Sequence, residues 1–406
     1  MRQYALTLIT TIKPAQVELL RSTLYQLSDS VKQKLRALGT VHYGRFVIID
    51  ETNLDGQYTD AQLIYTTNAD VDPDKHIADI CATMSVELDA IYAFCNHYQT
   101  TSRASSLRAM KIPEMAFYQG SPGRTVAVIE QEKALYDFLW KIKQDGNWKG
   151  QSAIAVHQQL RKAVLSNPNF DWVAQPVDVP KINWLGLVIF GIVQLAFAPF
   201  IILWAIYMQL FHEQFDTPLG LDRNQLSDEH ITTMQRDEDF HFQNQFSQVI
   251  DMKPGKARLF TVNLLYFITR ILIKLLFVKG KLMGIPTIHF ARWVMINDKK
   301  RMFFESNFDG SWTQYLGDFI DKSGWGLTGI FGNTKGFPRA LLLILKGAYN
   351  QQKFLAWSRH TQIATQIWFA YDPEISIKNI NNNTVIRNLL PKNLNEKEAT
   401  KLLALI

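Results

Sequence analysis

Apolar and polar positions along the chain repeat one order of elements twice. A short apolar strand, at 5–9 in the first copy and 246–250 in the second, is followed by Lys-Pro and a helical pattern. Two strands joined by a turn, a second helix and a last strand come next in both copies. This β-α-β-β-α-β order is that of the ferredoxin-like split motif. The pattern therefore predicts an α+β protein built from two tandem units.

The two copies also match residue by residue. The segment VHYGRFV at 41–47 recurs as IHFARWV at 288–294, and IYTTNAD at 64–70 recurs as FFESNFD at 303–309. Length differences are confined to the first helix and to a hairpin after the second strand. We interpret the chain as a tandem duplication of ferredoxin-like units that form an α+β barrel-like core, with an apolar helical insert between them.

The same patterns divide the chain into segments. Between the two copies lie a helical region, a long apolar run and a polar stretch rich in Asp and Glu. We expect a ferredoxin-like repeat 1 at 1–140, a helical connector at 141–181, an apolar membrane-associated segment at 182–211, an acidic linker at 212–245, a ferredoxin-like repeat 2 at 246–390 and a C-terminal tail at 391–406.

The apolar segment 182–211 contains no charged residue. It is longer than the ~20 residues that a helix needs to span a bilayer, which disfavours a buried core helix. Trp184 and Trp204 suit anchoring at a membrane interface, and Pro199 is expected to kink or break the helix. The segment therefore predicts membrane contact, either as a span or as a helix that lies in the interface.

The duplication restricts how this segment meets the membrane. If the two repeats pair with each other, both must lie on one side, and a single crossing at 182–211 would separate them. A kinked helix that dips into the interface or lies in its plane avoids that conflict. We therefore expect a monotopic protein on the cytoplasmic face of a membrane, with a single-pass topology as the alternative.

A second helical region also favours a position at the membrane surface. From 252 to 297 the chain has no Asp or Glu, and Arg270 and Lys274 belong to a narrow basic stripe on an otherwise apolar helix. Such a stripe suits the headgroups of anionic lipids. The alternative is a helix that packs on the sheet and leaves its basic stripe in water. Anionic membrane lipid is thus the predicted partner.

Composition excludes several classes of protein. Hydrophobic residues make up 47% of the chain and charged residues 20%, which excludes a disordered chain. The formal net charge of +6 is only mildly basic, and we expect no nucleic-acid partner. Two cysteines exclude a disulfide scaffold, and no His, Cys or carboxylate set has the spacing of metal ligands, so we expect no metal. The opening residues lack the pattern of a signal peptide.

Arg45 and Arg292 occupy the same place in the two copies, on the apolar face of a predicted strand. A buried guanidinium group needs an anionic partner. One interpretation is a lipid or another anionic ligand held between the repeats. The other is an ion pair with Asp70 or Asp309 of the same copy. Strand alternation places two aligned histidines, as structural residues, on the opposite face: His42 and His289.

The two-repeat layout resembles the dimeric α+β barrel proteins, and among them the dye-decolourising peroxidases. The segments IHFARWV, FESNFDGSWTQYLGDFID and GFPRA are similar to an uncharacterised membrane-associated family of that general build. The peroxidases carry a Gly-x-x-Asp-Gly motif with a distal Asp, a distal Arg and a proximal haem His. Here Asp309 and Gly310 match the end of that motif, and its leading Gly is missing. The resemblance implies Arg292 and Asp309 as catalytic residues and His360 as the ligand of a haem.

Two functions follow from these patterns. The first is that of a membrane-associated α+β barrel protein that binds a lipid or an anionic ligand between its repeats. The alternative is a haem-dependent, peroxidase-like oxidoreductase, in which haem is the cofactor. The sequence leaves the oligomeric state open.

Overall fold

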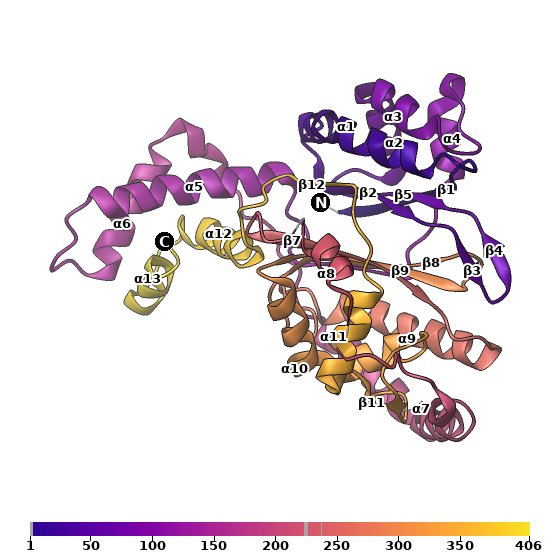
Figure 1. Ribbon diagram of the computed structural model, residues 1–406. Helices are drawn as coiled ribbons and strands as arrows, with labels where there is room; N and C mark the ends of the chain where they lie inside the picture. The colour runs from indigo at the N-terminus through magenta and orange to yellow at the C-terminus, as the bar shows by residue number, and fades with distance from the viewer. Residues whose placement is uncertain (1–2, 223–225, 237) are drawn as a thin grey trace.

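Two four-stranded antiparallel sheets lie at the centre of the computed structural model, which describes residues 3–222, 226–236 and 238–406 (Figure 1). In order across the sheet, the N sheet consists of β1 (Tyr4–Thr11), β5 (Gln62–Ala69), β2 (Val41–Ile49) and β12 (Ile367–Ala370). The C sheet consists of β6 (Ala116–Gln119), β8 (Ile288–Ile296), β9 (Arg301–Asp309) and β7 (Gln243–Asp251). The chain is 51% helix and 20% strand, so the predicted α+β class is confirmed.

Each half of the chain gives its last strand to the sheet of the other half. Strand β6 belongs to the first half but pairs with β8, and β12 belongs to the second half but pairs with β2. Both pairings are antiparallel. Because each sheet takes strands from both halves, neither half holds its complete sheet alone.

The two sheets face each other, and the prediction of a barrel-like core is wrong. Apolar side chains from both sheets meet between them in one cluster, which includes Val47, Ile64, Val249, Val294 and Phe303. Among the described residues no sheet closes into a barrel. One reason lies at the edge of β1, where the chain before β6 makes a single bridge, Leu8 to Lys111, and then leaves that strand.

Helices cover the outer face of each sheet (Figure 1). The N sheet packs against α1 (Val17–Ala37), α2 (Pro73–Thr83), α3 (Ser85–Tyr92) and α4 (Arg103–Ala109). The C sheet packs against α9 (Lys256–Leu275), α10 (Trp312–Phe331) and α11 (Gln351–His360). Asp72 and Ser311 accept backbone hydrogen bonds as the N-caps of α2 and α10. Two small hairpins extend from this body: β3 (Thr52–Leu54) with β4 (Gln57–Thr59), and β10 (Ala340–Leu341) with β11 (Leu345–Lys346).

A helical arm extends from one end of the sheets (Figure 1). It contains α5 (Val126–Asp145), α6 (Ala153–Leu165), α12 (Ile377–Leu389) and α13 (Glu396–Leu403), which share one apolar cluster. Residues of the predicted connector and of the predicted C-terminal tail therefore pack together. Helix α13 begins at a capping box in which Asn395 and Glu398 satisfy each other's backbone N–H groups.

The apolar segment forms one helix, α7 (Trp184–Phe211), on the far side of α9 from the C sheet (Figure 1). It is 28 residues long and continues through Pro199. Its start and its end both contact α9: the N–H of Asn183 donates to the carbonyl of Leu275, and the indole of Trp204 donates to Thr261. Helix α7 therefore runs antiparallel to α9 along most of its length. Helix α8 (Asp228–Gln235) follows within the predicted acidic linker.

Candidate functional site

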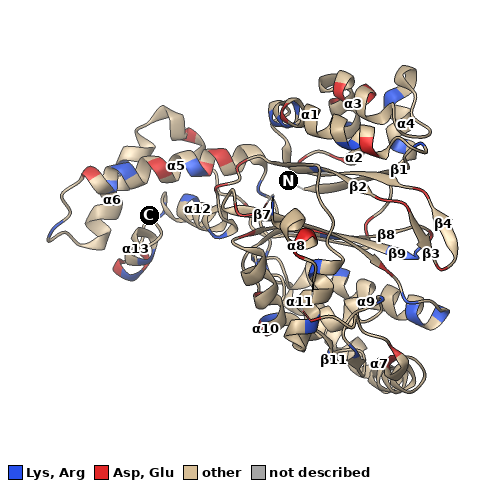
Figure 2. Ribbon diagram, viewed as in Figure 1, with Lys and Arg blue, Asp and Glu red and all other residues tan. Residues whose placement is uncertain are grey.

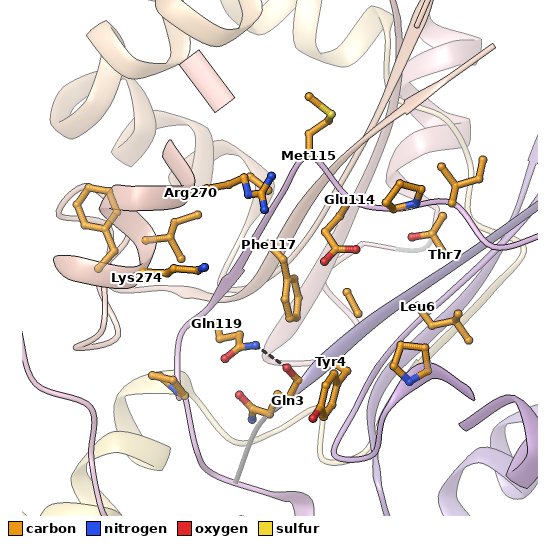
Figure 3. Close-up of a pocket in the computed structure, with 18 of the residues that line it drawn as sticks. Gln3, Tyr4, Leu6, Thr7, Glu114, Met115, Phe117, Gln119, Arg270 and Lys274 are labelled. Carbon is orange, nitrogen blue, oxygen red and sulfur yellow. Dashed lines mark hydrogen bonds between the residues drawn. The ribbon is translucent and has the colours of Figure 1, made fainter. Parts of the chain in front are cut away.

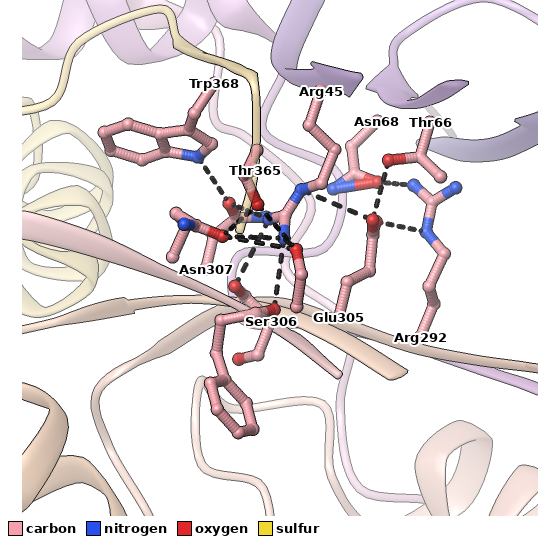
Figure 4. A network of polar contacts seen from close by, with 12 residues as sticks. Arg45, Thr66, Asn68, Arg292, Glu305, Ser306, Asn307, Thr365 and Trp368 are labelled. Carbon is pink, nitrogen blue, oxygen red and sulfur yellow. Dashed lines mark hydrogen bonds and ion pairs between the residues drawn. The ribbon is translucent and has the colours of Figure 1, made fainter. Parts of the chain in front are cut away.

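The two predicted arginines meet at one carboxylate between the sheets (Figure 4). The side chains of Arg45 on β2 and Arg292 on β8 are each 1% exposed, and their Nε atoms lie 3.3 Å and 2.7 Å from the carboxylate of Glu305. Thr66 donates a 2.6 Å hydrogen bond to the same carboxylate. The expected ion pair of each arginine with the aspartate of its own copy is therefore wrong. Glu305 on β9 takes that place because it lies between both guanidinium groups.

Apart from one hydrogen bond from Arg45 to Gln245, the remaining hydrogen bonds of the two guanidinium groups correspond one to one. Each arginine donates to two backbone carbonyls, one hydroxyl and one asparagine of the facing sheet. For Arg45 these acceptors are Phe246, Ser306, Ser247 and Asn307. For Arg292 they are Leu6, Thr67, Thr7 and Asn68. Each arginine therefore joins its own sheet to the facing sheet through these hydrogen bonds.

The charges of this network do not balance locally. Burial lowers the pKa of both guanidinium groups, and the negative charge of Glu305 opposes that shift. Arg292 lowers the pKa of Arg45 further, whereas Glu114 raises the pKa of Arg292. Two buried cations share one buried carboxylate, and Glu114 supplies the next negative charge near Arg292.

Asp70 and Asp309 instead pair with the two aligned histidines. The Nε2 atom of His42 lies 2.8 Å from Asp70, and that of His289 lies 2.6 Å from Asp309. The second carboxylate oxygen of each aspartate accepts the first N–H of a helix in the arm, from Val126 of α5 or Ile377 of α12. These pairs therefore tie the ends of the sheets to the helical arm.

The predicted placement of the histidines on the outer strand face is wrong. Both strands have an irregular register at the histidine, between Val41 and Tyr43 and between Ile288 and Phe290. Such a bulge changes the side to which a strand residue points. The ring of His42 consequently lies 5.4 Å from the ring of Phe290 on the other sheet. Strand alternation alone could not indicate this.

His360 lies elsewhere, at the end of α11. Its ring centroid is 6.5 Å from that of His230, and burial, followed by the charge of His230, lowers the pKa of His360. It borders a surface hollow with Asp251 and Arg301. Arg292 lies in the arginine network, Asp309 beside its histidine and His360 on this surface. The three residues implied by the peroxidase resemblance therefore do not surround one space that could hold a haem, and no chemical step through haem follows from them.

A cavity of about 560 Å³ opens between the edges β1 and β6 and the helix α9 (Figure 3). Apolar residues from all three elements line much of it, among them Leu6, Met115, Phe117, Ile273 and Phe277. Charged side chains enter from two sides: Arg270 and Lys274 from α9, and Glu114 from the segment before β6 (Figure 3). This volume lies in the range of small-molecule sites. The cavity was not predicted from the sequence, although Arg270 and Lys274 were.

A long apolar surface accompanies this cavity on the outer side of α9. Helix α7 carries no charged residue (Figure 2) and is the one described helix long and apolar enough to cross a membrane. Trp184 is largely exposed and Pro199 is exposed, whereas Trp204 is half-buried against α9. The exposed large apolar residues of this helix are Trp184, Leu185, Val188, Ile189, Ile192, Val193, Leu195, Phe197, Phe200, Ile201, Ile202, Leu203, Ile206, Tyr207, Leu210 and Phe211.

Comparison with known proteins does not extend this picture. No family model, no curated protein and no solved structure matches the chain.

Proposed function

We propose that this protein is a monotopic membrane protein that lies on anionic lipid through α7 and α9 and holds a ligand between its two sheets. The observation that carries the proposal is the exposed apolar surface of α7. Monomeric soluble proteins rarely expose so large a contiguous apolar surface, and lipid contact removes it from water. Arg270 and Lys274 on the adjoining α9 supply positive charge for anionic headgroups.

The sheet pairing favours a monotopic arrangement over a single span. Strand β12 follows α7 in the chain but pairs with β2, which precedes it. The two parts of the chain therefore lie on the same side of any membrane that α7 meets. Because α7 runs along α9 from Asn183 to Trp204, a transverse orientation would also carry α9 into the hydrocarbon layer. Helix α7 thus lies in the interface, and tags at the two chain ends should report one side.

The cytoplasmic face is the side that these features suit. Its leaflet carries anionic lipid, which attracts the basic residues of α9. Both cysteines are free thiols, and Cys95 is buried, which suits a reducing compartment.

We also propose that the two halves are tandem copies of one ferredoxin-like unit whose last strands have been exchanged. The support is that four hydrogen bonds of Arg45 correspond one to one with the four hydrogen bonds of Arg292. Equivalent helix N-caps and equivalent His–Asp pairs extend that correspondence to both ends of the units.

Flotation with lipid vesicles tests the attachment. In Leu195→Glu/Phe200→Glu two charges enter the exposed face of α7, and we expect this variant to stop floating with phosphatidylcholine vesicles that contain phosphatidylserine. The matched control is Leu19→Glu/Val86→Glu on the helices of the N sheet. Leu195 and Val86 are equally exposed, at 76% and 75%. The control should float like the unaltered protein, and equal flotation of both variants would refute attachment through α7.

A further inference from the structure

We propose that the cavity between β1, β6 and α9 binds a single-chain amphiphile whose headgroup carries both a phosphate and an amine. The inference rests on the proposed function, because it names the ligand held between the sheets. The phosphate would lie at Arg270 and Lys274, the amine at Glu114, and the hydrocarbon chain along the apolar walls. A lysophosphatidylethanolamine has this chemistry.

The first argument is that charges of both signs border the cavity without a protein ion pair within 4.0 Å in the described part of the chain. Arg270 and Lys274 are one helical turn apart on α9, and no ion pair within 4.0 Å joins either of them to a described carboxylate. Glu114 likewise has no ion pair among the described residues, and its carboxylate points into the cavity from the side opposite α9 (Figure 3). A headgroup with one negative and one positive centre complements both walls.

The second argument comes from the corresponding edge of the molecule. Between β7 and β12 the corresponding positions carry polar side chains that bond to each other and to Arg45. There Gln245 accepts hydrogen bonds from Arg45 and from Thr365. At the open edge the residues in these two places are Ala5 and Glu114, which both line the cavity. The cavity therefore has a small residue and a carboxylate that forms no ion pair with a described residue at the positions where the other edge has two hydrogen-bonded polar residues.

The third argument is the position of the cavity next to the helices proposed to contact the membrane. Helix α9 borders the cavity with Arg270 and Lys274 and contacts the membrane helix α7 on another side. A lipid from the membrane surface can therefore reach the cavity along the basic residues of α9. The apolar walls, which include Phe117, Ile273 and Phe277, accept its chain.

Binding of three soluble probes to the full-length protein tests the proposal. Lysophosphatidylethanolamine carries phosphate, amine and chain, lysophosphatidate lacks the amine, and phosphoethanolamine lacks the chain. We expect the first to bind most tightly. Glu114→Gln should weaken lysophosphatidylethanolamine about tenfold, as for loss of one charge-assisted hydrogen bond, and leave lysophosphatidate unchanged. If Glu114→Gln tightens both lipids equally, the carboxylate only repels phosphate and the proposal is overturned.

Matched double variants in α9 and in the segment just after it distinguish binding in the cavity from general attraction to basic residues. Arg270→Ala/Lys274→Ala should weaken both lysolipids about tenfold or more. Lys256→Ala/Lys281→Ala removes the same charge from positions outside the cavity lining and should change neither affinity. Equal effects of the two double variants would overturn the assignment of the phosphate. Tight binding of phosphoethanolamine without a chain would overturn the amphiphile and leave a free phosphoamine as the ligand.

A transplant of the edge between β7 and β12 tests whether the cavity itself is the site. Ala5→Gln/Glu114→Thr introduces the side chains found at that edge, and we expect it to abolish binding of both lysolipids while flotation with vesicles is retained. Conversely, Leu195→Glu/Phe200→Glu should lose flotation but still bind lysolipid from solution. Failure of the cavity proposal and failure of membrane attachment are thereby distinguished. Undiminished lysolipid binding by the transplant would refute the cavity as the site.

Discussion

The two edges between the sheets share four arginine hydrogen bonds, yet they differ in the residues beside them: Gln245 and Thr365 at the closed edge, Ala5 and Glu114 at the open edge. At the closed edge, the amide oxygen of Gln245 accepts from Arg45, Ser247 and Thr365. At the open edge, Arg292 keeps its own hydroxyl, asparagine and carbonyl acceptors, but no side chain at Ala5 can play the part of Gln245. The arginine hydrogen bonds that join the sheets therefore do not depend on which residues occupy the adjoining edge.

A second difference between the copies lies at the centre of the network. Glu305 on β9 and Thr66 on β5 occupy corresponding places, and Thr66 donates to Glu305 across the gap between the sheets. One carboxylate therefore serves both arginines. A carboxylate in place of Thr66 would bring two negative charges within hydrogen-bonding distance of one another.

The largest expected effect is on stability and comes from removing that carboxylate. Glu305→Gln leaves two buried guanidinium groups without their shared counter-charge. We expect the free energy of unfolding to fall by about 3–5 kcal/mol, the usual cost of breaking a buried ion pair. Urea unfolding in one fixed detergent would measure it.

A surface pair from the same sheet is the control for that loss. Asp251 pairs with Arg301 at 3.0 Å, and the carboxylate side chain is 36% exposed. Because solvent screens such pairs, Asp251→Asn should cost less than about 1 kcal/mol. If the two variants lose similar stability, Glu305 is not the charge that holds the arginines.

The next expected effect is a pH dependence of stability that comes from α2 and has no counterpart on α10. His76 on α2 is 1% exposed, and the residue in the corresponding place on α10 is Tyr315. Burial lowers the pKa of His76 to about 4. Below pH 6.5, the ordinary pKa of histidine, His76 binds a proton in the unfolded chain but stays neutral in the folded chain down to about pH 4. The free energy of unfolding should therefore fall as the pH falls from 6.5 to 4, by up to about 3 kcal/mol.

His76→Phe tests this pH dependence because a phenyl ring fills the site without titrating. Unfolding measured at pH 7 and at pH 4.5 should show a smaller loss in the variant than in the unaltered protein. The same loss in both would assign the acid sensitivity to other groups.

Local patterns in the sequence predicted the elements but not every partner. The apolar periodicity gave the order of strands and helices in both copies, and the apolar face of each strand placed Arg45 and Arg292 between the sheets. The exchange of β6 and β12 was missed because a strand's pattern shows which face is buried, not which distant strand it pairs with. The bulges at His42 and His289 depend on backbone register in the same way.

The residues that define the candidate site were missed for a related reason. Glu305 aligns with Thr66, so a search for residues shared by both copies passes over it. Glu114 and Ala5 matter through the space between two edges, and no local sequence pattern describes a space bounded by three distant elements. The positions that differ between the two halves would have been the useful signal. Residues that both halves share, such as Arg45 and Arg292, join the sheets, whereas residues that differ, such as Ala5 and Glu114, line the cavity.

The smallest expected effect concerns the closed edge. Gln245→Ala removes one neutral acceptor from Arg45, which keeps the carbonyl of Phe246, the hydroxyl of Ser247 and the amide of Asn307. Ser247 and Thr365 lose the same acceptor but stay hydrogen-bonded to each other. We expect the free energy of unfolding to fall by about 1.5–2 kcal/mol, the lower end of the usual value for a hydrogen bond to a charged group. Ala5→Gln, the reciprocal change, adds a side chain at an edge that is already stable without it and should alter the unfolding midpoint less. If Ala5→Gln instead destabilises more than Gln245→Ala, the open edge is not spare space but part of the packing that holds the sheets together.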